Sequence, residues 1–258
     1  MNKKLSRLSY ILLILALTLT ACAQKNGTEQ VSDSLSAART ALLSQCSDMG
    51  EEYIDSFIFI GESTTAHLKS RGVLKGGRDT CQVWAPKSGT MTLDTTSTGV
   101  RIVYPETGKE MTVGEAAKQK KPRRVLFTFG LNGAVDKIKR GEKYFKTCYK
   151  SLIRTVTDAS PETEVILQAC FPVARSMDMS AYTVDVSTLN SYISTINSWT
   201  LSLAEELGIG YLNTTEALCD SDGFLKEEYQ SGDGYHLTAE AYRQMLWYMR
   251  THGDGEGV

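Results

Sequence analysis

The chain has 258 residues, with 28 Lys and Arg against 30 Asp and Glu, and a formal net charge of −2. Proteins that hold nucleic acid through its phosphates carry an excess of clustered cations, so this balance argues against nucleic acid as a partner. The length suits one sizeable hydrophobic core and is short for two. We expect one catalytic domain over residues 34–250, followed by a disordered tail at 251–258.

The N-terminus has the layout of a secretory signal, with Lys3, Lys4 and Arg7 ahead of the apolar run 10–19. That run is shorter than the roughly 20 apolar residues that a transmembrane helix needs. The segment Leu19-Thr20-Ala21-Cys22 resembles a bacterial lipobox, whose cysteine is lipidated after cleavage. We therefore expect a signal peptide at 1–21, a lipid anchor at Cys22, a flexible tether at 22–33 and an extracytoplasmic location at the cell membrane. Ordinary signal cleavage beside an incidental cysteine is the alternative.

The remaining five cysteines are scattered, and an odd number cannot all pair within the chain. They form no CxxC motif and no cluster with His at metal-ligand spacing, so we expect no metal and no cofactor. Two of them lie in apolar patterns and are predicted to be small core residues. The five are Cys46, Cys81, Cys148, Cys170 and Cys219, of which Cys148 and Cys170 are the predicted core pair.

One basic cluster surrounds Pro122, and it comprises Lys118, Lys120, Lys121, Arg123 and Arg124. Cations at the C-terminus of a helix complement its dipole, so we interpret the cluster as a solvated helix end. A site for an anionic polymer is the alternative.

Short apolar runs alternate with helical patterns, which is typical of an α/β domain with a mostly parallel sheet. We predict a three-layer α/β/α sandwich with five strands, similar to flavodoxin-type folds, plus a small β-hairpin insertion. The predicted strands are 57–60, 81–84, 125–129, 165–169 and 209–212, the hairpin strands 100–104 and 111–113, and the helices 34–49, 64–71, 142–158, 186–207 and 237–250.

Several polar residues follow the ends of these strands, where parallel sheets bind ligands. Ser63 lies after the first strand and before a helix, so its hydroxyl would reach this rim and its N–H would face developing negative charge. Asn132 follows the third strand, and Gly89 follows the second, where the lack of a Cβ admits a substrate oxygen. Each residue also has an ordinary interpretation, as a helix cap or a turn residue.

Asp233 and His236 lie three residues apart before the last helix, close enough for the carboxylate to accept the imidazole Nδ1 proton. A serine hydroxyl needs such a pair to act as a nucleophile. Of the other histidines, His252 falls in the Gly-rich tail. His67 stands four residues after Ser63 on the same helix face, and we expect it to line the mouth of the site.

In their order and content these segments resemble the SGNH hydrolases, also called GDSL-type esterases and lipases, over roughly residues 57–247. The resemblance carries the nucleophile to Ser63, the backbone donor to Gly89, the GxND asparagine to Asn132 and the DxxH pair to Asp233 and His236. Two positions depart from the pattern, since Glu62 and Gly133 stand where the family has Asp.

The resemblance implies a serine esterase that works through an acyl-enzyme, with an oxyanion hole formed by Ser63, Gly89 and Asn132. Its expected substrate is an O-acyl, principally O-acetyl, ester on carbohydrate. Two alternatives stay open: an acyltransferase with the same triad and a non-catalytic glycan-binding lipoprotein. The sequence does not specify the oligomeric state. The expected pocket residues are Glu62, His67 and Tyr235, with residues 174–185 as a lid, Trp84 and Tyr182 as candidate sugar platforms, and Trp247 in the core.

Overall fold

The computed structural model describes residues 40–96 and 99–253. Its central sheet has five parallel strands in the order β3-β2-β6-β7-β8. The bounds are β3 (Val83–Trp84), β2 (Phe57–Gly61), β6 (Arg124–Thr128), β7 (Glu164–Gln168) and β8 (Gly210–Leu212). All five predicted strands are therefore present, each within two residues of its expected limits.

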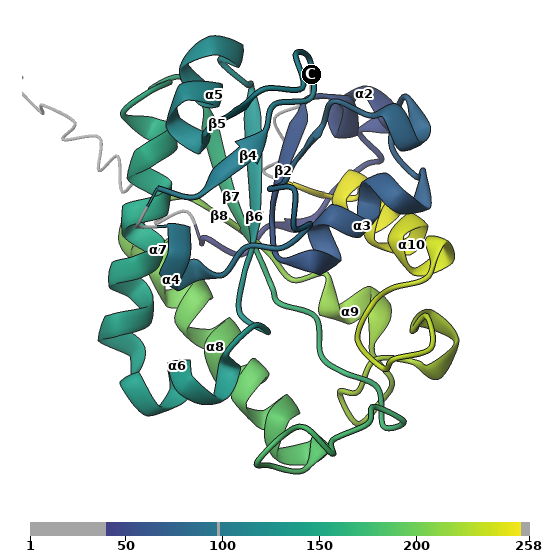
Figure 1. Cartoon of the computed structure of the whole chain (residues 1–258). Coiled ribbons are helices and arrows are strands. Elements are labelled where there is room, and N and C mark those ends of the chain that lie inside the picture. The colour runs from purple at the N-terminus through teal and green to yellow at the C-terminus, as the bar shows by residue number, and fades with distance from the viewer. Residues whose placement is uncertain (1–39, 97–98, 254–258) are drawn as a thin grey trace, which may run out of the picture. The chain divides into compact units, whose positions relative to one another are not determined.

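Helices cover both faces of this sheet, as Figure 1 shows. Alternate residues of β2 point to opposite faces: Ile58 and Ile60 join one hydrophobic cluster, whereas Phe57 and Phe59 join the other. The first cluster lies under α5 (Val113–Lys120), α6 (Ala134–Arg140), α7 (Glu142–Thr157) and α8 (Val186–Leu207). The second lies under α2 (Gly50–Asp55), α3 (Ser63–Arg71), α9 (Thr215–Leu218) and α10 (Ala239–Arg250). The three-layer sandwich is confirmed.

The predicted hairpin is also present, as β4 (Arg101–Val103) paired antiparallel with β5 (Glu110–Thr112). The short helix α4 (Leu93–Thr96) precedes it. Thr112 and Glu115 then form a capping box that starts α5. Lys118 and Lys120 lie in the last turn of α5, so this part of the basic cluster occupies a helix end, as predicted.

The N-terminal helix expected at 34–49 is wrong over its described part. Residues 44–45 form strand β1 (Ser44–Gln45), which pairs antiparallel with β9 (His252–Gly253), so the described part of the expected tail is also ordered. Leu43 donates to the Tyr211 carbonyl (2.9 Å), and Tyr211 donates to that of Ala41 (2.7 Å). This segment extends along β8 because an edge strand presents unpaired backbone groups that need partners.

Trp247 is 54% exposed, so the expectation that it belongs to the core is wrong. Its neighbours Leu246 and Met249 are buried and occupy the inner face of α10. Cys148 and Cys170 are buried, as expected. Within the described ranges no helix is long and apolar enough to cross a membrane. The predicted signal peptide, the predicted lipid anchor at Cys22 and the predicted tether lie outside these ranges.

Candidate active site

Ser63, His236 and Asp233 form a continuous hydrogen-bonded chain, although 173 residues separate the serine from the histidine. The Ser63 Oγ lies 2.8 Å from the His236 Nε2, and the His236 Nδ1 lies 2.6 Å from the Asp233 Oδ2. Ser63 is the first residue of α3, where N–H groups have no partner within the helix. The helix thus places a hydroxyl and an unshared N–H side by side at the rim of the sheet.

The loop that carries Asp233 and His236 is held by its own backbone. The Asp233 Oδ1 accepts hydrogen bonds from the N–H groups of Tyr235 (3.1 Å) and His236 (2.9 Å), which leaves Oδ2 for the imidazole. Burial opposes ionisation of Asp233, but the N–H donors of His236 and Tyr235 outweigh it and lower the pKa of the carboxyl. Asp233 is therefore a carboxylate at neutral pH and fixes the proton of His236 on Nδ1.

Gly234 lets the segment after β7 pack closely against this loop. Its φ is +86°, and a Cβ there would meet the Cα of Met177 at 2.5 Å. Ala174 donates its N–H to the Gly234 carbonyl (2.7 Å). The first part of the predicted lid, residues 174–177, is thus a fixed wall against the loop that holds the triad.

Two rings pack against the imidazole of His236. His67 and Tyr235 each have their ring centroid 4.2 Å from that of His236, at interplanar angles of 32° and 39°. The His67 Nδ1 is buried and has no hydrogen-bond partner among the described residues. Burial, together with the charges of His236 and Arg71, lowers the pKa of His67. His67 is therefore neutral and packs directly against His236. It lies closer to the triad than the position at the pocket mouth that the sequence predicts.

Glu62 is 3% exposed and accepts three backbone hydrogen bonds from the loop after β6. Its carboxylate oxygens bind the N–H groups of Gly130 (3.1 Å), Leu131 (3.0 Å) and Asn132 (3.0 Å). Burial raises the pKa of Glu62, and these donors oppose the rise. The predicted pocket residue is therefore a buried support that sets the backbone of Asn132.

Lys137, which sequence reasoning missed, supports the same loop. It is 1% exposed, donates to the Asn132 carbonyl and lies 3.8 Å from the Asp94 Oδ2. A Cβ on Gly133 would lie 3.4 Å from its Nζ, so the ammonium stands beside the position where the family pattern has Asp. The sequence signal was slight, a lysine in the short helix α6 that follows Gly133.

The structure supports Asn132 and Gly89 unequally as oxyanion donors. The Asn132 Nδ2 donates to the Thr90 Oγ1 (3.0 Å) and to the Met91 carbonyl (3.2 Å), so it must exchange one of these bonds to bind an oxyanion. The Gly89 N–H closes a turn onto the Pro86 carbonyl (2.9 Å). The expectation for Gly89 is therefore not supported, because its donor is already used, and Thr90 and Met91 are the residues of this loop that contact Asn132.

Of the aromatic candidates for a sugar platform, Trp84 is buried in the core. Tyr182 and Tyr235 instead line a cavity of about 370 Å³ that Asn132 also borders. The triad and this cavity thus share one rim.

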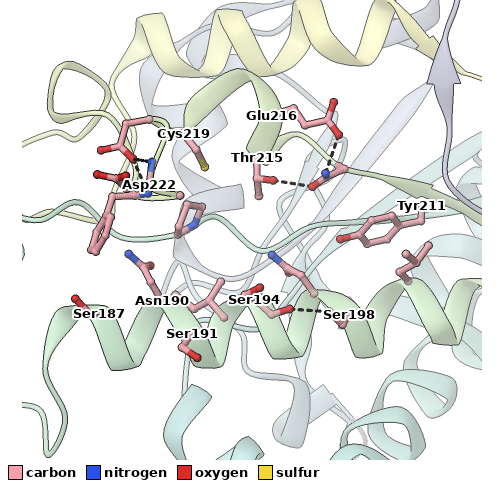
Figure 2. A pocket seen from close by; sticks show the side chains of 18 of the residues that line it. Ser187, Asn190, Ser191, Ser194, Ser198, Tyr211, Thr215, Glu216, Cys219 and Asp222 are labelled. Atoms are coloured by element: carbon pink, nitrogen blue, oxygen red, sulfur yellow. Dashed lines mark hydrogen bonds between the residues drawn. The ribbon is translucent and has the colours of Figure 1, made fainter.

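A second polar hollow, of about 730 Å³, lies between α8 and α9 (Figure 2). We call it the α8 groove. The two asparagines that α8 contributes bind backbone: Asn190 pairs with the N–H and C=O of Val173, and Asn197 pairs with those of Cys170, all at 2.8–2.9 Å. These amides replace the sheet partners that the chain loses where it leaves β7.

The GDSL-like lipase/acylhydrolase family model matches residues 59–244. Among solved structures, a protein from Streptococcus pneumonia named for platelet activating factor is 16% identical, with a TM-score of 0.54 over 76% of this chain and 82% of that one. A GDSL-like lipase from Bacteroides thetaiotaomicron is 16% identical, with a TM-score of 0.48 over 75% and 85%. A carbohydrate acetylesterase from Sinorhizobium meliloti, Est24, is 12% identical, with a TM-score of 0.45 over 75% and 95%. No curated protein matches significantly.

The family match covers most of the chain, and the first of these structures has the same fold. The four segments that resemble the SGNH pattern all contribute to the rim described above. The chain belongs to the GDSL-like lipase/acylhydrolase family and is a hydrolase of ester bonds.

Proposed function

We propose that Ser63 is the nucleophile of a serine esterase, with His236 as its base and Asp233 as the residue that orients the imidazole. The observation that carries this proposal is the unbroken chain from the Ser63 Oγ through both ring nitrogens to the Asp233 Oδ2, at 2.8 and 2.6 Å. A serine that merely capped α3 would have no need of an imidazole and a carboxylate in line.

In this mechanism the Ser63 Oγ attacks the ester carbonyl carbon while its proton moves to the His236 Nε2. The tetrahedral oxyanion is stabilised by the Ser63 N–H and the Asn132 amide. The bond to the alcohol oxygen then breaks as His236 returns the proton to that oxygen, which leaves an acyl group on Ser63. Water repeats the sequence, with His236 taking its proton and passing it to the Ser63 Oγ, and the acid is released.

We further propose that the substrates are O-acyl, principally O-acetyl, esters of carbohydrate. The cavity that adjoins Asn132 and Tyr235 supports this class, because its lining includes amide, hydroxyl and charged side chains along with aromatic rings. A long fatty acyl chain would be better served by a mainly apolar channel. An extracytoplasmic location with a lipid anchor at Cys22 stays part of the proposal, on the sequence alone.

The decisive experiment compares wild type with Ser63→Ala on a chromogenic acetyl ester and on a fluorophosphonate probe. The variant should lose turnover and labelling while it keeps the melting temperature of the wild type, since Ser63 is at the surface end of α3 and fills no core space. Equal rates in the two proteins would refute the assignment. Adding an acceptor sugar then separates hydrolysis from acyl transfer, because only a transferase would form a new ester.

A further inference from the structure

The cavity beside Asn132 and Tyr235 has a defined relation to the reacting atoms. Tyr235 packs against the ring of His236, and the Nε2 of that ring contacts the Ser63 Oγ. In the proposed mechanism the same nitrogen must return a proton to the departing alcohol oxygen. Tyr235 also lines this cavity, so the cavity adjoins the imidazole that protonates the departing alcohol, while the acyl part stays on Ser63.

The size of this cavity fits a single small ring. Its volume of about 370 Å³ lies near the lower end of the range for small-molecule sites, roughly 300–1,000 Å³. A separate cleft of about 800 Å³ runs along α3, with Val83, Ala85 and Val103 in its lining. Lys69 and Arg78 also line this cleft, so the smaller cavity is distinguished by its place next to Asn132 and Tyr235.

The lining of the smaller cavity matches a polyol. Tyr182 is 40% exposed and Tyr235 is half-buried, so both present ring surface with a phenolic hydroxyl at its edge. Asp136 and Lys139 of α6 add an acceptor and donors. A sugar ring alternates C–H faces with hydroxyls, and such a surface pairs with an aromatic face and with hydrogen-bonding groups at the same time.

The charge of Asp233 reaches both tyrosines. Burial and this carboxylate raise the pKa of Tyr182, and burial, the same carboxylate and Tyr182 raise that of Tyr235. Both phenols are consequently neutral hydrogen-bond donors at neutral pH, adjacent to the triad and to each other.

We infer that this cavity is the subsite for the alcohol part of the substrate and that it holds a sugar ring, with Tyr182 as its specificity-determining residue. The inference rests on the proposed esterase mechanism and adds to it the side of the ester on which the sugar is recognised. Tyr182 acts through substrate alone, whereas Tyr235 also supports His236.

The test varies the alcohol at a fixed acyl group and then the acyl group at a fixed alcohol. The first pair is methyl 6-O-acetyl-glucopyranoside and ethyl acetate, and the second series is 4-nitrophenyl acetate, butyrate and octanoate. In Tyr182→Ala the ratio of kcat/KM for the sugar acetate to that for ethyl acetate should fall about tenfold, mainly through KM, because the lost stacking is of the order of a kilocalorie per mole. The acyl-length profile should keep its wild-type shape.

Two further variants control the test. Tyr182→Phe keeps the ring and should retain the ratio to within about threefold, since the face carries most of the contact. Trp247→Ala removes an exposed aromatic side chain of α10. It should leave both the sugar-to-ethyl ratio of kcat/KM and the acyl-length profile unchanged. A change in the acyl-length profile of Tyr182→Ala, with the sugar-to-ethyl ratio intact, would assign the cavity to the acyl group and overturn the inference. A wild type that hydrolyses none of these esters and is not labelled at Ser63 would instead contradict the esterase mechanism.

Discussion

The rim with Ser63 and the α8 groove are both rich in amides and hydroxyls, yet these groups do different things. In the groove both ends of the Asn190 and Asn197 amides are engaged, because each pairs with both the N–H and the C=O of one residue in the segment after β7. At the rim the chain from Asp233 through His236 ends on the hydroxyl of Ser63, at the surface. The groove is the larger hollow, at about 730 Å³ against about 370 Å³ for the cavity at the rim, so volume does not identify the reactive region.

The difference lies in where each hydrogen-bond chain ends. A side chain whose donors and acceptor are satisfied by buried backbone contributes to stability, because its removal leaves unpaired groups. The hydrogen-bond chain at the rim instead ends on the Ser63 hydroxyl, which remains available to attack a substrate. Substitutions at the rim should therefore lower activity and spare stability, whereas substitutions in the groove should lower stability and spare activity.

Outside the triad, the largest effect is expected at Asn132. Asn132→Ala should lower kcat about 100- to 1,000-fold, the range seen when one oxyanion donor is removed, while the protein stays folded. The measurement is steady-state hydrolysis of an acetyl ester beside a thermal melt. A matched control is Thr90→Val, which removes one of the two present acceptors of the amide and leaves the donor and the Met91 carbonyl in place. A loss below about threefold in Asn132→Ala would make Asn132 a structural residue that only ties the loops together.

In the groove, Asn197→Ala should produce the opposite pattern. The substitution leaves the N–H and C=O of Cys170 without partners, and the free energy of unfolding should fall by about 2–4 kcal/mol. Urea unfolding measures this, and kcat per folded molecule should match wild type. Ser198→Ala is the control on the same helix: within the described part of the chain its hydroxyl bonds just the Ser194 carbonyl one turn earlier, so its loss should be nearly neutral. If Asn197→Ala were as stable as wild type but inactive, the groove would serve activity in the same way as the rim, and the proposed difference between the two regions would be wrong.

His67 tests how far the rim extends beyond the triad. Its ring packs against His236, and aromatic contacts of this kind contribute about 1 kcal/mol, so His67→Ala should lower kcat/KM roughly fivefold. Because the pKa of His67 is lowered, the side chain is neutral at pH 7 and a neutral ring should replace it. His67→Phe should recover most of the rate at pH 7. If Phe were as slow as Ala, the imidazole would act through its nitrogens and not as a wall.

The sequence predicted the regular parts of the molecule well, because local pattern determines them. The strand β2 (Phe57–Gly61) and the helix α8 (Val186–Leu207) follow from apolar runs and from helical spacing closed by Gly208, a glycine in the left-handed conformation at the C-cap. The rim followed because parallel strands bring their carboxyl ends together.

What the sequence missed depends on contacts between distant segments. Residues 40–49 are extended because β8 offers an edge, and no local pattern reports that edge. Lys137 is buried because Glu62 and the Asn132 carbonyl lie near it. The turn onto Pro86 that uses the Gly89 donor could not be read from a lone glycine. Trp247 was assigned to the core by its neighbours, although a helix turns by about 100° per residue and adjacent residues face differently.

The smallest effect is expected on α8 itself, on a face that carries charges instead of amides. Glu206 forms ion pairs with Lys146 and with Lys150 (2.7 Å), and these hydrogen bonds lower its pKa from 4.5 to about 2. A lowered folded-state pKa means that the stabilisation is present above the ordinary pKa and is lost as the pH falls toward 2. Glu206→Gln should accordingly lower the Tm by no more than a few degrees at pH 7, and the difference from wild type should close between pH 4.5 and 2.

The matched control is Glu205→Gln, one residue earlier, for which the described residues provide no ion pair. It should leave the Tm unchanged at both pH values, and added salt should shrink the Glu206 effect because exposed pairs are screened. A Glu206→Gln difference that persisted at pH 2 would mean that the side chain acts by packing and not by charge. In that case the polar side chains on this face of α8 would stabilise the fold by packing, at every pH, and would resemble the amides of the groove in this respect. If the difference closes as expected, α8 carries two kinds of polar group: amides that fix backbone at every pH, and charges that matter only while they are ionised.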